Sequence, residues 1–594
     1  MPDRRLGLLA LVSYILVAVA VIGPTTLFTA DVVAGRGIDL PGTIWIHWWI
    51  RTTVEQGAIP IHTDLLFYPE GKNFFTDTGA NFIDAWLGTP LQWLFGVPDF
   101  LDALQVVLLV GNALCMQALA KEITGGTAPA AAWAAAIAFE VNPFVLQQVN
   151  EGRPTQVMLW FAVLATRSLL RVPTGTWKDA ALFGLYTALQ GLTYWFTVYF
   201  LTLALLPLAV VLLVRAPRVV APRLALAVAV AVAVTAPFLV GIASEIDSGN
   251  VRRLSFGSWE ESPAAADGRW HLIVDQMASS AGLLTFGLAA LALRRSWPLL
   301  VGTAITIAVS VGGRLDITDP PLTNGFFVLL WENLPLFPRL GFPDRAAMGT
   351  FLLLPLAAAL GLMRIDKVYA WMFAVVLVGE GFWRGGLPVQ TTRSGVPAAA
   401  THIRDNPGAV IYLPFGANDD AMVHQTFHGQ PIFGGMGERE EDLRPPGYKK
   451  RLQNGFVVML GGTLNDTDVP IQYTAAEREA ITSTYRWVWF DRRYGPPAWR
   501  AAGYDTDGKY ARLVRELGEP AINQKGFALW DLHRPAPADA PGLGPDARRT
   551  GKELSRLDAG NLKPGEKGVV LPSGAPRGPS GRGPGGPGPG GGRR

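Results

Sequence analysis

Residues 31–78 contain several side chains that could do acid–base chemistry, in a polar stretch between two hydrophobic segments. Its carboxylates include Asp31, Asp39 and Asp64, which can accept or donate protons, and it also has two histidines and three tryptophans. A loop of this length without its own core is usually functional or disordered, and this many aromatic residues argue against disorder. We therefore expect the loop to fold onto the ends of membrane helices and to hold the reacting groups.

Arginines in the other polar connections are candidates for binding a phosphate, because a guanidinium can donate two parallel hydrogen bonds to it. Arg153 lies in the short turn NEGRPTQ at 150–156, and Arg339 and Arg345 flank the start of a hydrophobic run near 346. Two other roles compete with this one. The arginines could anchor to lipid headgroups, or they could pair with neighbouring acids such as Glu151 and Asp344.

Two further groups of the first loop have alternative interpretations. His47 with His62 and Asp64 is a candidate divalent-metal site, because His62 and Asp64 project to the same side of an extended strand. The metal signal is weak, and a hydrogen-bonded surface is the more common explanation of such residues. Trp45 and Trp49 could stack on a sugar ring, although anchoring at the membrane interface is the more common role of such tryptophans.

The composition indicates a polytopic membrane protein. The chain has 594 residues, a mean hydropathy of +0.25 and only 17% charged residues. A net charge of +3 gives no support for nucleic-acid binding. The single cysteine, Cys115, excludes an intrachain disulfide and a multi-cysteine metal site.

Hydrophobic runs predict about eleven membrane-spanning helices. They lie near 6–28, 100–120, 128–147, 154–171, 179–196, 197–214, 222–243, 276–293, 296–312, 346–363 and 368–384. Basic residues mark every second connection, which places the N-terminus in the cytoplasm and requires a bend between two short helices near 191–195. Glu140, near the outer end of the third run, is costly there and is expected to face a cavity or to pair with a neighbour.

The expected organisation has three parts. Residues 1–387 form the membrane domain, with its first outer loop at 30–99. Residues 388–534 form an extracytoplasmic α/β domain with strands at 409–415, 486–491 and 527–532, and residues 535–594 form a disordered tail rich in Gly, Pro and Arg. Within the first loop, Asp39 is a plausible N-cap for a helix that begins at Pro41, and residues 81–95 form a second amphipathic helix.

Several motifs resemble the GT-C fold of integral-membrane glycosyltransferases, and in particular a poorly characterised bacterial branch of that superfamily. The similar residues are Asp39 before a tryptophan-rich helix, LLFYPEGKNFF at 65–75, NEGRPTQ at 150–156, FPRLGFPDRAAM at 337–348 and the run at 409–435. The likeness covers most of residues 1–534. The chain departs from the branch where Ile38 separates Gly37 from Asp39 and where Gly42 replaces a common Gln.

The resemblance implies a function and roles for individual residues. It implies transfer of a sugar from a polyprenyl-phosphate donor to an envelope glycan, lipid or protein on the outer face of a bacterial cytoplasmic membrane. It places the catalytic base at Asp39, with Asp31 as the second candidate, whereas the competing interpretation is that Asp39 only caps its helix. Because no acidic pair follows in the first loop, the resemblance implies no definite metal or other cofactor.

Two other functions stay open at this point. A lipid or glycan transporter needs ionisable groups deep within its helices, but Glu140 and Glu380 both lie towards the outer ends of their runs. A non-catalytic scaffold that binds glycan or an envelope protein would not need Asp39. Replacement of that residue therefore separates a scaffold from an enzyme.

Overall fold

The structure is a computed structural model that divides into two compact units, each described here by itself. It describes residues 2–30, 32–74, 83–247, 259–261, 280–315, 318, 321–339, 342–383, 387–393, 395–415, 419–436, 438, 444–461, 472–493, 506–524, 526–535, 537 and 540. The first unit comprises residues up to 62 and residues 73–395, and the second comprises residues 63–72 and residues from 396 onward. Apart from 535, 537 and 540, the predicted tail lies outside the described residues.

Helices occupy all eleven positions at which the sequence predicts a span. They are α1 (Pro2–Ile22), α5 (Phe100–Ile123), α6 (Pro129–Glu140), α9 (Trp160–Arg171), α10 (Trp177–Thr193), α11 (Trp195–Arg215), α12 (Pro217–Asp247), α15 (Ser280–Leu291), α16 (Leu293–Ser310), α18 (Ala347–Leu362) and α19 (Lys367–Trp383). Among the described residues, five segments are long and apolar enough to cross a membrane: Phe100–Ile123, Pro129–Asn150, Trp195–Arg215, Pro217–Ser244 and Pro343–Leu362. The chain is thus a multi-pass membrane protein, while the count of eleven spans stays a prediction.

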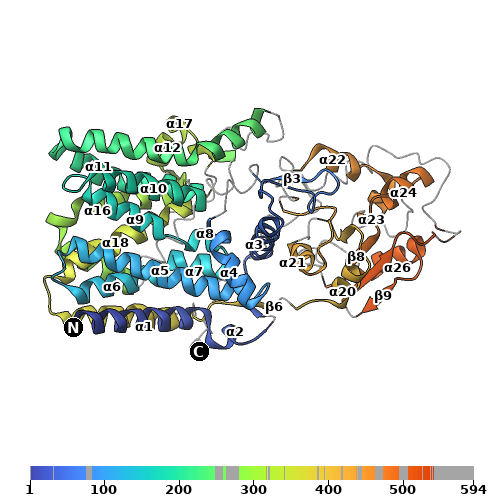
Figure 1. The fold of residues 1–594 in the computed structure, drawn as a ribbon, viewed down its shortest axis with the longest axis horizontal. Helices are drawn as coiled ribbons and strands as arrows, with labels where there is room; N and C mark the ends of the chain where they lie inside the picture. The colour runs from blue at the N-terminus through green and yellow to red at the C-terminus, as the bar shows by residue number, and fades with distance from the viewer. Residues whose placement is uncertain are drawn as a thin grey trace, which may run out of the picture. The chain divides into compact units, whose positions relative to one another are not determined.

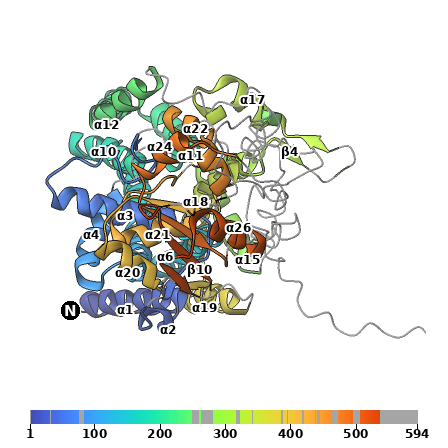
Figure 2. The ribbon, with the colours of Figure 1, turned by 90° about the vertical axis from the view of Figure 1, so that its right-hand side faces the viewer.

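The long helices of the first unit run roughly parallel to one another (Figure 1). Helix α18 lies in the interior, since nearly all of its side chains are buried, and it packs against α6, α15 and α16. Helix α12 has few buried side chains and lies at the opposite edge of the unit from α1 in both Figure 1 and Figure 2. An apolar helix that packs along one side against α10 and leaves most of its side chains exposed is suited to face lipid.

The predicted bend near 191–195 is present. Helix α10 ends at Thr193, helix α11 begins at Trp195, and Tyr194 between them has an extended backbone with φ −162° and ψ 114°. The break turns the chain between two short helices, as the basic residues on both flanks require.

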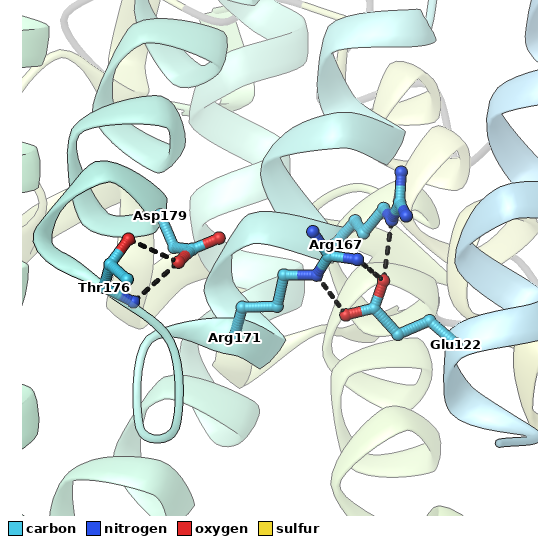
Figure 3. A network of polar contacts seen from close by, with 5 residues as sticks. All are labelled: Glu122, Arg167, Arg171, Thr176 and Asp179. Atoms are coloured by element: carbon cyan, nitrogen blue, oxygen red, sulfur yellow. Dashed lines mark hydrogen bonds and ion pairs between the residues drawn. The ribbon is translucent and has the colours of Figure 1, made fainter.

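At the end of α5, two arginines of α9 bind one carboxylate (Figure 3). Glu122 accepts hydrogen bonds from Arg167 Nε at 2.7 Å and from Arg171 Nε and Nη2 at 2.5 and 2.7 Å. After the next turn, Asp179 accepts from the backbone N–H of Thr176 at 2.7 Å, which caps α10. Asp102 lies twenty residues before Glu122, near the other end of α5. Because an α-helix rises 1.5 Å per residue, the backbone positions of these two residues are about 30 Å apart.

The first loop contributes three elements to the first unit: β1 (Val32–Ala34), α3 (Leu40–Glu55) and α4 (Ile83–Phe95). It also contains two short strands, β2 (His62–Thr63) and β3 (Lys72–Asn73). The chain passes from the first unit to the second within β2 and returns to the first within β3. The sequence predicts that the helix beginning at Pro41 lies in the membrane interface, but most residues of α3 are buried, so it is packed more deeply than that. Helix α4 matches the expected amphipathic helix and exposes Trp86 and Trp93. Strand β1 pairs antiparallel with β6 (Thr391–Arg393), so the residues just after the last predicted span belong to the first unit and not to the α/β domain as expected.

Shorter elements complete the first unit. They are α2 (Pro24–Leu27), α7 (Pro143–Asn150), α8 (Pro154–Val157), η1 (Trp259–Glu261), β4 (Arg314–Leu315), β5 (Leu322–Thr323), α17 (Gly325–Asn333), η2 (Phe337–Arg339) and η3 (Pro343–Ala346).

The second unit contains a four-stranded mixed sheet in the order β7-β8-β10-β9. Its strands are β7 (Val410–Leu413), β8 (Trp487–Asp491), β10 (Phe527–Asp531) and β9 (Ile522–Gln524), of which the first three lie at the predicted positions. β7 and β8 are parallel, and the other neighbours are antiparallel. The helices are α20 (Ala398–Asp405), α21 (Asp419–His428), α22 (Pro446–Leu452), α23 (Gly455–Gly461), α24 (Ala475–Thr482) and α26 (Thr506–Leu517).

One predicted helix of the second unit is divided in two. The sequence predicts a single helix at 447–460, but α22 ends at Leu452 and α23 begins at Gly455. Asn454 accounts for the break, because its side-chain oxygen accepts the backbone N–H of Phe456 at 2.9 Å. Asparagine commonly forms such local bonds at helix starts in preference to a helix interior.

Residues 63–72 of the first loop are part of the second unit. Their backbone bonds to the segment that follows α21, from Phe67 N to Gly434 O at 3.0 Å and from Ile432 N to Leu65 O at 2.9 Å. Because Ile432 also bridges to Val410 of β7, these residues extend the edge of the sheet. Leu66 and Phe67 are fully buried, so this segment is a core component of the unit and not a mobile loop.

Candidate functional site

The carboxylate of Asp39 is directed to an arginine and does not cap its helix. Asp39 is at the N-cap position of α3, but its backbone is helical, with φ −85° and ψ −15°, and its side chain makes no capping hydrogen bond. Its Oδ2 instead accepts a hydrogen bond from Arg153 Nε at 2.5 Å. The alternative in which Asp39 serves only as a cap is therefore not what the structure shows.

Glycines allow the backbone before Asp39 to lie against the turn that carries Arg153. Gly35 has φ +116° and a Cβ there would lie 3.3 Å from the backbone of Gly152. A Cβ on Gly37 would overlap the carbonyl oxygen of Glu151. Arg36 N donates to Asn150 O at 2.7 Å, which joins the two segments directly. The close approach fixes the distance between Asp39 and Arg153 through backbone contacts.

Strand β1, which leads to Asp39, is held by side chains that the sequence interpretation missed. Asp102 Oδ1 of α5 accepts the backbone N–H of Ala34 at 2.8 Å, and Gln105 Nε2 donates to the carbonyl of Ala34 at 3.4 Å. Thr392 of β6 donates to Gly35 O at 2.7 Å. Asp102 is an acid within an apolar run, and such a residue is unusual enough to have signalled a specific partner.

Arg153 lies between two carboxylates. Besides its bond to Asp39, its Nη2 is 3.7 Å from Glu151 Oε2, and its Nη1 donates to Gln148 Oε1 at 3.5 Å. Asp39 is about half exposed, whereas Arg153 is largely covered. A guanidinium held by these longer contacts keeps donor positions that an incoming phosphate can use.

Arg345 is placed by aromatic rings. It belongs to η3, directly before the buried helix α18, and its guanidinium lies 4.2 Å from the ring centroid of Phe342. The rings of Phe196 and Tyr194, at the break between α10 and α11, are at 5.1 and 5.3 Å. Arg345 lies within electrostatic range of both Arg153 and Asp39. The structure thus brings together three of the predicted site residues from segments far apart in the sequence.

Other predicted site residues lie elsewhere or have different surroundings. Glu140 is the last residue of α6, is fully buried, and has no hydrogen-bond partner on either oxygen among the described residues. Glu140 lies close enough to Tyr14 of α1 for the two side chains to interact electrostatically. Trp45 and Trp49 are buried and stack on each other at 5.7 Å, with Phe74 on Trp49 at 4.3 Å, so both rings face protein in this structure.

Two predicted residues cannot be placed. Asp31 and the side chain of Arg339 lie outside the described part of the chain. Their proposed roles stay predictions.

The predicted metal group is not assembled in the described part of the chain. His47 Nε2 lies 3.4 Å from Asp84 Oδ2 of α4, and its Nδ1 is 2.8 Å from the carbonyl oxygen of Thr43. Both ring nitrogens of His47 therefore face protein atoms. Among the described residues, no three His, Cys, Asp or Glu side chains gather where a metal ion could bind.

Comparison with known proteins identifies the fold. Neither a family model nor a curated protein matches the chain. The cryo-EM structure of the arabinofuranosyltransferase AftD from Mycobacteria matches 91% of the chain with a TM-score of 0.55 and 12% sequence identity. A mutant of AftD matches 90% of it with a TM-score of 0.53 and 14% identity. The chain has the GT-C fold.

The chain corresponds to less than half of AftD. The chain spans 40% of the length of AftD in one structure and 42% in the other. At this level of sequence identity the comparison establishes the GT-C fold alone, because one fold can carry different activities.

Proposed function

We propose that this chain is an integral-membrane glycosyltransferase that moves a sugar from a polyprenyl-phosphate donor to a glycan, lipid or protein acceptor. The observation that supports this proposal best is the 2.5 Å contact between Asp39 and Arg153, with Arg345 within electrostatic range of both, in a chain with the GT-C fold. A carboxylate beside two arginines supplies a proton acceptor and the cationic groups that a phosphate leaving group requires.

The roles follow from the chemistry of each group. Arg153 and Arg345 bind the donor phosphate, and the phosphate replaces Asp39 as the partner of Arg153. The freed carboxylate of Asp39 accepts the proton of the acceptor hydroxyl while the hydroxyl oxygen bonds to the anomeric carbon. The bond from that carbon to the phosphate oxygen breaks, and the negative charge that develops on the departing polyprenyl phosphate is held by the two guanidinium groups.

The reaction takes place at the outer face of the bacterial cytoplasmic membrane. The basic connections predict a cytoplasmic N-terminus, which puts the loop with Asp39 on the opposite side. The Glu122 network lies at the other end of α5 from Asp102, among the basic residues of the predicted cytoplasmic side. The donor, the lipid and the acceptor would therefore meet at the end of the bundle that carries β1 and α3.

Replacement of Asp39 with asparagine tests the enzymatic assignment. Asp39→Asn keeps the size of the side chain but removes the proton acceptor, so we expect transfer to fall by about a hundredfold or more. Mass spectrometry of lipid-linked and envelope glycans compares a deletion strain complemented with the wild type, with Asp39→Asn, or with Asp366→Asn. The last variant makes the same change at an exposed position between α18 and α19 and should complement fully. Normal glycans in the Asp39→Asn strain would refute the assignment.

A further inference from the structure

Helices α3 and α4 meet through a buried histidine and a buried aspartate. His47 of α3 is 1% exposed and Asp84 of α4 is 0% exposed, and His47 Nε2 lies 3.4 Å from Asp84 Oδ2. The packing around them is tight, because a Cβ on Gly88 would lie 3.1 Å from Cδ2 of His47. Gln92 Nε2 of α4 also donates to the backbone carbonyl of His47 at 2.9 Å. The pair thus lies in a dry contact between the two helices.

The hydrogen bonds of His47 determine where its first proton is. Its Nδ1 is 2.8 Å from the backbone carbonyl oxygen of Thr43, and a carbonyl oxygen can only accept. Nδ1 must therefore carry a hydrogen. In a neutral imidazole the other nitrogen, Nε2, then has only a lone pair.

A lone pair on Nε2 does not suit the neighbour that it faces. An ionised Asp84 also offers only lone pairs, and within the described part of the chain neither of its oxygens nor His47 Nε2 has another hydrogen-bond partner. Two bare acceptors in a buried contact would repel each other and lose their hydration without compensation. The contact is favourable only when one additional proton lies between them, on Nε2 or on the carboxyl group.

Among the residues that the structure describes, the charged groups of the adjacent helices do not provide an alternative partner for Asp84. Arg51, one turn further along α3, pairs with Glu55 at 3.6 Å. Asp102, on the adjacent helix α5, accepts the backbone N–H of Ala34. The ring of Phe100 also packs against that of His47, with the centroids 5.5 Å apart.

We propose that His47 and Asp84 share one proton across their contact and act as positioning residues for the site that contains Asp39. The positioning role rests on the proposed function, because Asp39 lies at the start of the helix that His47 anchors. The shared proton keeps the pair electrically neutral overall, which avoids an uncompensated buried charge. It thereby keeps α3 against α4 and holds the start of α3 at the turn that carries Arg153.

The proton itself is measured by nuclear magnetic resonance on the full-length chain in detergent micelles at pH 7. The chain has seven histidines, so ¹⁵N-histidine labelling gives few signals, and those of His47 are the ones lost in His47→Leu. We expect Nδ1 of His47 to be protonated in either case. If the shared proton is on His47, Nε2 is protonated too. If it is on Asp84, the infrared spectrum shows a band of a neutral carboxyl group that disappears in Asp84→Asn. A bare Nδ1, or a protonated Nδ1 with a bare Nε2 and no carboxyl band, would overturn the proposal.

The positioning role is measured by the binding of decaprenyl phosphate to the same preparations. Asp84→Asn provides an amide N–H to the bare Nε2 of a neutral imidazole, so binding should stay within about twofold of the wild type. His47→Leu leaves the buried carboxyl group without a partner, so binding should weaken about tenfold or more. Gln56→Leu, a change at the exposed residue that directly follows α3, should have no effect. Wild-type binding in His47→Leu, or equal losses in both pair variants, would refute the role.

The two measurements separate this inference from the proposed function. The resonance experiment uses no activity and no donor. If Asp39→Asn left transfer unchanged while His47 showed the expected protons, the proposed function would fail and the shared proton would stand.

Discussion

The guanidinium of Arg345 is oriented by three aromatic rings, and this suggests that a lysine could not replace it. Cation–π contacts and bidentate hydrogen bonding both favour a planar guanidinium over an ammonium group. We expect Arg345→Lys to weaken binding of a polyprenyl phosphate by about tenfold, or about 1.4 kcal/mol. Titration of the purified protein with the lipid phosphate measures this. Arg364→Lys, in the exposed turn that follows α18, is the control and should bind normally. Undiminished affinity of Arg345→Lys would exclude a direct role for its guanidinium.

Lys509 in the second unit gives a residue-level prediction for pH dependence. Burial lowers the pKa of Lys509 to about 7, with the nearby Arg512 adding to the effect, and its ammonium group donates to Met459 O at 2.9 Å. The unfolded chain has a lysine pKa of about 10.4, so between about pH 7 and pH 10 the unfolded state binds more protons. Stability must then rise with pH in this window, by up to about 1.4 kcal/mol per pH unit.

The variant Lys509→Met should remove this pH dependence because methionine does not titrate. Thermal unfolding followed by tryptophan fluorescence at pH 6 and pH 9 compares it with the wild type. The wild type should gain more stability at pH 9 than the variant does. Lys450→Met, an exposed lysine of α22, should behave like the wild type. An equal gain in Lys509→Met would show that another group is responsible.

Some residues of the site could be found from the sequence and others could not. Asp39, Arg153 and Arg345 stand out because charged side chains in short polar connections of a membrane protein are few. That the three meet could not be derived, because they are brought together by long-range packing of three segments. Asp102 supports the site from a hydrophobic helix, where attention to the loops alone overlooks it.

At the level of elements, the glycines before Asp39 allow the first loop to lie against the turn that carries Arg153. In Gly37→Ala the new methyl group would overlap the backbone of Glu151, and backbone cannot move aside as a flexible side chain can. We expect the loop to shift away from the turn and lipid-phosphate binding to fall about tenfold or more. Gly287→Ala, with open space around its Cβ in α15, should bind like the wild type. Normal binding in both would mean that the close approach is dispensable.

Periodicity and capping signals predicted the elements better than they predicted the partners of those elements. The sequence predicts a helix over 475–485 behind an N-cap at Thr474, and the structure has a capping box of Thr474 and Glu477 at the start of α24. By contrast, residues 63–72 gave no local signal of their membership in a sheet more than three hundred residues later. Their hydrogen bonds to 432–434 depend on tertiary contacts, which local propensity does not encode.

On the scale of the whole molecule, the orientation in the membrane is directly testable because the chain has a single cysteine. In a Cys115→Ala background, Gly57→Cys probes the first loop, where a side chain would meet open space, and Asp366→Cys probes the connection between α18 and α19. The basic residues predict that an impermeant thiol reagent labels position 57 in intact cells and position 366 only after permeabilisation. The reverse pattern would invert the topology and place the reaction in the cytoplasm.

The membership of residues 63–72 in the second unit has a consequence for how this protein can be divided. Arg451 pairs with Glu70, and Gly435 leaves room for Leu66, so the C-terminal part lacks a piece of its own interior when it is made alone. A gene fragment that starts at 396 would encode an incomplete fold with an apolar gap. A soluble version for crystallography or antibody selection should therefore include residues 63–72, covalently linked to the fragment that starts at 396. When the second unit is exchanged between related proteins, the exchange should succeed only if residues 63–72 and the part from 396 onward come from the same protein.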